Sequence, residues 1–200
     1  MRPLSGLPRL ALCLLAAALA ACESRPDHLA PEDDLADTEW SLVDQDSSAV
    51  AFPSDFAGRP TVVSAIYTQC PDVCLMTMAT LRRVRAALGP DTSRVRFVTL
   101  SFDPARDTPS VLRRYAASWN TGPGWHLLTG DSTEVASLMD RIGVRTRVLR
   151  RDTLASGTVG YAIDHSDVAL LLDADGAVVE TYGGSAAIPE MVAEDARALL

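Results

Sequence analysis

The chain has 200 residues, a length that suits one domain with additional terminal segments. Its composition, 48% hydrophobic and 22% charged, is ordinary for a globular protein and excludes wholesale disorder. A formal net charge of −8, carried by a chain without a basic stripe, argues against nucleic acid as a partner.

The first 21 residues are typical of a bacterial secretion signal. Arg2 and Arg9 give a positive start, and residues 10–21 form an apolar stretch with the length of a signal-peptide core rather than a membrane span. Residues 19–22 read Leu-Ala-Ala-Cys, which resembles a lipobox and predicts lipidation of Cys22. The alternative is an ordinary signal peptide with a chance cysteine at its boundary. We therefore expect an exported protein that is lipid-anchored to a bacterial membrane, with its domain in the periplasm or otherwise outside the cytoplasmic membrane.

After Cys22 the sequence up to residue 38 is polar, acidic and contains proline. This composition predicts that residues 22–38 comprise the lipidated cysteine and a flexible tether. The folded domain is then expected to occupy residues 39–200.

The first half of the domain reads as two strands that alternate with two helices. Residues 61–67 form a continuous apolar, β-branched run typical of a strand buried on both faces. A helix follows TQCPDVC and is expected to end at Gly89-Pro90. Residues 95–101 predict a second strand, and Thr108-Pro109 predicts the start of a helix that runs to about residue 119.

The second half predicts a short helix over residues 133–141, a strand over 168–172, a turn at Asp175-Gly176, a returning strand over 178–182 and a final amphipathic helix over 188–200. The whole order suits a mixed sheet with helices on both faces. We therefore predict an α/β protein with the thioredoxin-like arrangement.

Cys70 and Cys74 lie in the segment TQCPDVC, where the first predicted strand passes into a helix. Backbone N–H groups at a helix start favour negative charge, so the pKa of thiols placed there is expected to fall. A separation of four residues puts both sulfur atoms on one side of a helix, with Cα atoms about 6 Å apart, within the range of a disulfide. The pair is predicted either to hold one metal ion or to close a redox-active disulfide.

Two thiolates favour soft metals, namely Cu(I), zinc or iron–sulfur clusters. A closed zinc site or a cluster needs about four protein ligands, whereas only these two thiols remain once residues 1–21 are removed and Cys22 is lipidated. Two sulfur atoms and one imidazole suit Cu(I), and Cu(II) with an added water or carboxylate. His165 is the candidate imidazole, because it directly precedes a predicted strand whose entry faces the active-site helix in thioredoxin-like folds.

Four segments, YTQCPDVC, SFDPARDTP, WHLLTG and IDHSDVALLLDADG, resemble in order and sequence the signature blocks of the Sco/SenC family. The resemblance covers roughly residues 40–200. It implies a thioredoxin-like fold with an inserted hairpin or loop, for which residues 145–160 are the candidate. It also implies copper bound by Cys70, Cys74 and His165, and a role in assembling the binuclear copper centre of cytochrome c oxidase. The copper-bearing oxidase subunit is then the expected partner; other copper chaperones and thiol reductants are further candidates.

Two carboxylates are candidates for supporting the site. Asp164 precedes His165 and is expected either to orient the imidazole or to face solvent in a turn. Asp103 follows a strand end and is expected either to approach the copper loop or to form a plain Asp-Pro turn.

Two functions compete on this basis. A copper metallochaperone would hand over copper by ligand exchange and would depend on His165 as much as on Cys70 and Cys74. A thiol–disulfide oxidoreductase would reduce the copper-binding cysteines of the acceptor and would tolerate replacement of His165. The CxxxC spacing differs from the CxxC of thioredoxins, which favours the metallochaperone. Peroxide reduction and a purely structural disulfide are weaker alternatives, so enzymatic activity stays an open question.

Overall fold

The computed structural model describes residues 25–153 and 159–200. The predicted secretion signal and the lipidation site Cys22 lie outside the described residues. Among the residues described, no helix combines the length and the apolar character needed to cross a membrane.

A mixed eight-stranded sheet forms the centre of the molecule, in the order β1-β10-β9-β4-β5-β6-β2-β3. β4 (Thr61–Ile66), β5 (Arg96–Ser101) and β6 (Trp125–Gly130) run parallel, and β9 (Val168–Leu172) pairs antiparallel with β4. Every residue of β4 is buried, as its continuous apolar sequence predicts for a strand covered on both faces. The cysteine loop therefore follows directly on a strand that is fully enclosed by the fold.

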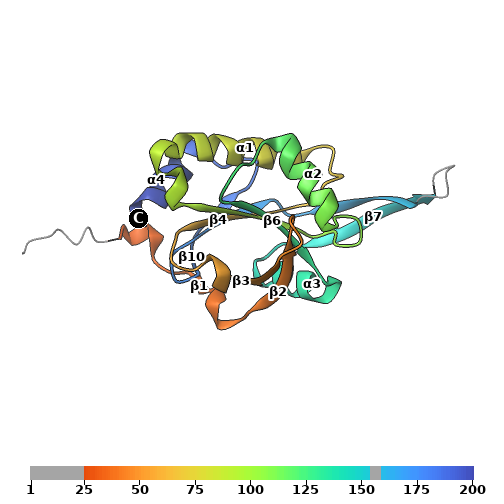
Figure 1. Ribbon diagram of the computed structural model, residues 1–200, viewed down its shortest axis with the longest axis horizontal. Coiled ribbons are helices and arrows are strands. Elements are labelled where there is room, and N and C mark those ends of the chain that lie inside the picture. Colours follow the sequence, from red (N-terminus) through yellow and green to blue (C-terminus); the bar gives the residue numbers. More distant parts are fainter. Residues whose placement is uncertain (1–24, 154–158) are drawn as a thin grey trace, which may run out of the picture.

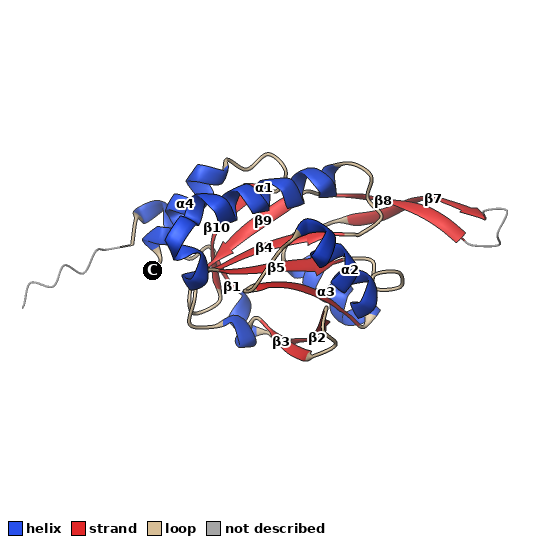
Figure 2. Ribbon diagram, turned by 45° about the horizontal axis from the view of Figure 1, so that its top comes forward, coloured by secondary structure: helices blue, strands red, loops and turns tan. Residues whose placement is uncertain are grey.

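Helices cover both faces of this sheet (Figures 1 and 2). α1 (Val73–Leu88), α2 (Pro109–Trp119) and α4 (Pro189–Ala198) lie on one face, and α3 (Ser132–Arg141) lies on the other. Because side chains alternate along a strand, neighbouring residues of β4 enter different cores: Val62 packs with the α1 side and Val63 with the α3 side. The observed layers agree with the predicted α/β arrangement.

The segment expected to be a flexible tether is packed against the domain from residue 25 onward. It contains the short 3₁₀ helices η1 (Asp27–Leu29) and η2 (Leu35–Asp37), and between them β1 (Asp33–Asp34), which pairs with β10 (Ala177–Gly183). Leu29 and Leu35 are fully buried, because each inserts into one of the two cores. The boundary expected at residue 39 is therefore too late.

The strands β2, β3 and β6 were not predicted from the sequence. β2 (Trp40–Asp44) and β3 (Ala49–Phe52) form a hairpin that adds to the edge of β6, and β6 itself lies within WHLLTG. β2 approaches β6 closely, since a Cβ atom added to Gly130 would lie 2.8 Å from Leu42 Cδ2. These strands extend the sheet beyond the segments predicted from hydrophobic runs.

β7 (Thr146–Thr153) and β8 (Val159–His165) form a separate two-stranded antiparallel ribbon that projects from the body of the molecule (Figure 2). This ribbon occupies the segment expected to hold an inserted hairpin or loop. Its base carries the pair Thr146 and His165, so the insertion delivers His165 to the end of the central sheet.

Candidate metal centre

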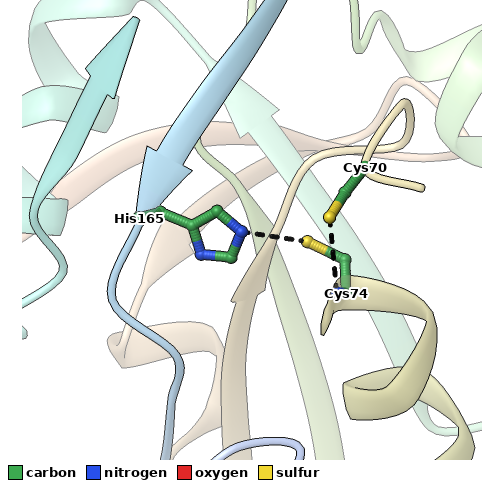
Figure 3. Close-up of side chains that lie close together, drawn as sticks. All are labelled: Cys70, Cys74 and His165. Carbon is green, nitrogen blue, oxygen red and sulfur yellow. Dashed lines mark hydrogen bonds between the residues drawn. The ribbon is translucent and has the colours of Figure 1, made fainter. Parts of the chain in front are cut away.

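Three segments that are distant in sequence meet at the carboxyl end of β4 (Figure 3). Cys70 lies in the loop after β4, Cys74 lies in the first turn of α1, and His165 is the last residue of β8. Their two sulfur atoms and one imidazole nitrogen all lie within 4.8 Å of one another. The predicted trio is therefore brought together.

The cysteine loop folds back on itself at the start of α1. The N–H of Cys70 donates to the carbonyl of Tyr67 at 3.2 Å, and the N–H of Cys74 donates to Cys70 Sγ at 3.5 Å. Asp72 is the N-cap residue, yet its side chain makes no capping hydrogen bond. A cysteine sulfur therefore accepts from the first helical turn, in the position that a capping oxygen usually takes.

The hydrogen bonds of His165 define which nitrogen is available to a metal. Nδ1 lies 3.0 Å from the carbonyl oxygen of Ser166, which can only accept, so Nδ1 carries the proton. Nε2 is then left with its lone pair and lies 3.5 Å from Cys74 Sγ. The ring packs against Tyr67 and Phe102, with centroids 5.9 Å and 4.7 Å away, and this packing fixes its plane.

Both cysteines of the site are buried, and burial affects the ionisation of Cys74. Cys70 is 7% exposed and Cys74 is 1% exposed, and both are free thiols. Removal from water raises the pKa of Cys74. This effect is larger than the lowering that we expected from the backbone N–H groups at the start of the helix. A bound cation would reverse the balance, because a coordinating thiol loses its proton to the metal.

The two predicted supporting carboxylates lie elsewhere. Asp164 points to the exposed side of the ribbon and pairs with Arg147 at 3.2 Å, because successive residues of a strand face opposite sides. Ser166, through its carbonyl, orients His165 instead. Asp103 is buried and accepts hydrogen bonds from Arg106 and from the hydroxyl of Tyr161 in β8, so it contacts the ribbon and not the metal ligands.

Residues 30–200 match the SCO1/SenC family. The chain belongs to this family. The SCO2-like protein of Rickettsia felis is 26% identical over 145 residues, which cover 72% of this chain and 67% of that protein. The mitochondrial SCO2 homolog of Mus musculus is 29% identical over 141 residues, covering 70% of this chain and 53% of that protein.

Two solved Sco structures have the same fold. ScoI of Bradyrhizobium japonicum with copper bound is 30% identical, with a TM-score of 0.71, covering 82% of this chain and 98% of that one. Apo Sco1 of Thermus thermophilus is 25% identical, with a TM-score of 0.65, covering 85% of this chain and 96% of that one. The predicted family and thioredoxin-like fold class are confirmed.

Two buried or half-buried carboxylates hold the site of this SCO1/SenC protein in place, and the sequence reasoning missed them. Asp107 is fully buried and accepts from the N–H of Thr68 at 2.9 Å, from its hydroxyl at 2.5 Å, and from Ser101 Oγ at 2.6 Å. It therefore fixes the start of the cysteine loop. The only available signal was its place within the segment SFDPARDTP.

Asp167 connects the histidine side of the site to α1. Its carboxylate accepts from Thr77 Oγ1 at 2.9 Å and from the N–H of Ser185 at 2.7 Å. Thr77 lies one helical turn after Cys74, and Asp167 lies two residues after His165. This one side chain thus sets the position of the histidine loop relative to the cysteine helix.

The donor set fits a soft metal ion after a small adjustment. Metal bonds of about 2.3 Å to sulfur and about 2.0 Å to imidazole nitrogen allow two ligand atoms to be at most about 4.6 Å apart. The largest separation here is 4.8 Å or less, so shifts of a fraction of an ångström bring all three atoms within bonding range of one ion.

Proposed function

We propose that this protein binds one copper ion through Cys70, Cys74 and His165, and delivers it to the copper-bearing subunit of cytochrome c oxidase during assembly. The observation that carries the proposal is the convergence of two sulfur atoms and one imidazole nitrogen within 4.8 Å. Copper is the cargo of this function, not a permanent cofactor.

The chemistry of the donors supports copper over other metals. Two thiolates and one imidazole form a soft, three-coordinate set that suits Cu(I), whereas a closed zinc site is almost always four-coordinate. The ScoI structure of Bradyrhizobium japonicum, from a relative that is 30% identical, also has copper bound.

Delivery proceeds by exchange of ligands. His165 is half-buried and Cys70 is slightly more exposed than Cys74, so an acceptor reaches the ion from the side of these two residues. Each sulfur or nitrogen of the acceptor that bonds to copper replaces one ligand of this site, and the oxidation state of copper is unchanged. Cys74, which is the most buried ligand, is then the last to dissociate from copper.

A direct binding experiment tests the proposed ligand set. Anaerobic titration of the reduced protein with Cu(I) is expected to give one tight equivalent. His165→Ala should weaken binding by more than the roughly 10–100-fold loss that is typical of supporting residues. His28→Ala is the matched control, because it removes an imidazole that bonds to Asp195 and not to any of the three ligands. Equal binding by His165→Ala and the parent would remove His165 from the site.

Transfer is tested separately from binding. The Cu(I)-loaded protein is mixed anaerobically with the purified copper-binding domain of the oxidase subunit, the two proteins are separated, and the copper content of each is measured. Copper found on the acceptor domain supports delivery; tight binding by this protein without transfer would refute the proposed acceptor and leave the copper site standing.

Thiol–disulfide exchange is a second candidate, favoured by the two free sulfur atoms that lie side by side. In that reaction Cys70 and Cys74 lose two electrons and two protons and form a disulfide, while a disulfide of the acceptor gains them and opens. The near-complete burial of both thiols works against attack on a large substrate. Reduction of an acceptor disulfide at an unchanged rate by His165→Ala would favour this candidate.

The localisation is also a proposal. The apolar stretch of residues 10–21 and the lipobox-like ending at Cys22 support export and lipid anchoring, with the domain outside the cytoplasmic membrane. Mass spectrometry of the protein from membranes should find an acylated N-terminal Cys22. Cys22→Ser should release the protein from membranes; retention of that variant in the membrane would contradict a lipid anchor at this residue.

A further inference from the structure

A large pocket lies at the amino ends of the parallel strands, and the metal centre lies at their carboxyl ends. Its walls come from β2 and β3, from the segment that precedes β4, and from the first residues of β5 and β6. The end of α1 and the adjoining 3₁₀ helix η4 (Gly89–Arg94) complete them. Its volume is about 750 Å³, within the range of about 300–1,000 Å³ that is usual for small-molecule sites. The six residues of β4, about 20 Å long, separate this end of the sheet from the cysteine loop.

Three arginines line this pocket, which we call the arginine pocket: Arg59, Arg85 and Arg96. Each donates to a backbone carbonyl: Arg59 to Ser93 at 3.1 Å, Arg85 to Pro123 at 2.7 Å, and Arg96 to Asp55. Among the residues whose side chains are described, none of the three forms an ion pair with a carboxylate. The guanidinium groups are thus held in place by carbonyl groups and not by a direct ion pair.

The charges of the arginines are only partly offset in the pocket. Burial and the neighbouring charge of Arg59 lower the pKa of Arg96, which shows that these two cations repel each other. Two carboxylates also line the pocket, but both already accept hydrogen bonds from the backbone: Asp44 from two N–H groups at 2.8 Å and 2.9 Å, and Asp55 from one at 2.8 Å. A bound anion would relieve the repulsion between Arg59 and Arg96.

The remaining wall is aromatic and apolar. Phe56 is buried, with the guanidinium carbon of Arg96 5.8 Å from its ring centroid and the ring of His126 packed edge-on at 5.3 Å. His126 Nδ1 is buried and has no hydrogen-bond partner among the described residues. Cationic groups beside an aromatic wall fit a ligand with a charged head and an apolar body.

We propose that the arginine pocket is a binding site for a small organic phosphate, with the phosphate on Arg59, Arg85 and Arg96 and the apolar body against Phe56. Guanidinium groups suit the acceptor oxygens and the near-double negative charge of a phosphate monoester. The proposal is independent of copper, because no ligand of the metal centre lines this pocket.

Phenyl phosphate is a suitable probe, because it combines an aromatic ring with a phosphate monoester. Calorimetric titration of the reduced, copper-free protein should show one saturable site, with affinity at least about tenfold higher than for inorganic phosphate, phenol or benzoate. Equal binding of phenol would show an apolar pocket without an anion site, and tighter binding of benzoate would refute the phosphate assignment.

The three histidines of the chain report where the probe binds. Ring resonances of His126 should shift on titration with phenyl phosphate, while those of His28 and His165 stay in place. Arg59→Gln, at an exposed position, should weaken binding at least about tenfold. Arg82→Gln is the matched control, since it removes the same charge from the exposed surface of α1 and should change affinity less than about twofold. No saturable binding, or a shift of His165 in place of His126, would overturn the proposal.

Discussion

Gly184 is the position where one added methyl group should disturb the metal centre most directly. A Cβ atom at Gly184 would lie 2.3 Å from Asp167 Oδ1, 3.1 Å from its Cγ and 3.2 Å from Thr77 Cγ2. The carboxylate would have to leave this place. Its displacement breaks the hydrogen bond from Thr77, which joins the histidine loop to α1, and the one from the N–H of Ser185, which joins that loop to the segment after β10.

The size of the effect follows from these contacts. Forcing an extra methyl group into a packed site costs about 1–3 kcal/mol. Hydrogen bonds to a charged group contribute about 1.5–3 kcal/mol each, but Asp167 is only half-buried, so water replaces part of what is lost. We expect Gly184→Ala to lower the free energy of unfolding by about 2–4 kcal/mol, which for a protein of this size lowers Tm by about 5–15 °C.

The neighbouring glycine provides a matched control. A Cβ atom at Gly183 would have its nearest contact at 3.6 Å, with the Cβ atom of Ala186, which is an ordinary van der Waals distance. Gly183→Ala should therefore change stability by no more than about 0.5 kcal/mol, as is usual for surface substitutions. Denaturant unfolding of the copper-free, reduced proteins, followed by tryptophan fluorescence, measures both variants.

A second readout connects the clash to the metal centre. Copper titration of Gly184→Ala should show weaker binding than the parent and Gly183→Ala, because Asp167 lies two residues after His165 and no longer holds that loop to the cysteine helix. Equal stability of the two alanine variants would refute the assigned role of Asp167. A destabilised Gly184→Ala with unchanged copper affinity would confine that role to folding.

Three further predictions concern stability. A hydrogen bond to Asp195 raises the pKa of His28 above its ordinary value of 6.5. The stabilisation from this pair is therefore full below pH 6.5 and is lost as pH rises through the pKa that His28 has in the folded protein. The free energies of unfolding of the parent and of His28→Gln should differ in acidic buffer and coincide at high pH. Asp131 accepts from the N–H of Thr133, which lowers its pKa, so Asp131→Ala should reduce Tm at pH 7 and have no effect once acid has protonated the parent carboxyl. Arg106→Gln leaves the buried Asp103 without its cation and should cost about 3 kcal/mol in denaturant unfolding; a loss below about 1 kcal/mol would contradict a structural role for this ion pair.

Local sequence determined the elements whose signals are themselves local. α2 begins at Pro109 and ends at Trp119, and β9 spans Val168–Leu172, as hydrophobic runs and the Thr-Pro start predict. The cysteine pair and His165 were also predictable, because cysteines are few and the surrounding segments are specific. The two elements need only a short stretch of chain, whereas the choice of His165 also needed the expected fold and the resemblance of four separate segments to the Sco/SenC family.

Tertiary structure alone decided the features that depend on what lies across the fold. Polar residues around Leu29 and Leu35 read as a tether, yet two leucines reach the cores and hold the segment down. The alternation of strand β8 sends Asp164 to solvent, while Asp107 and Asp167 became supports because distant backbone N–H groups and hydroxyls meet them. The pKa of Cys74 is likewise set by burial, which no local pattern reveals. A sequence states which groups a chain has; only packing determines which of them lose water and which partner replaces it.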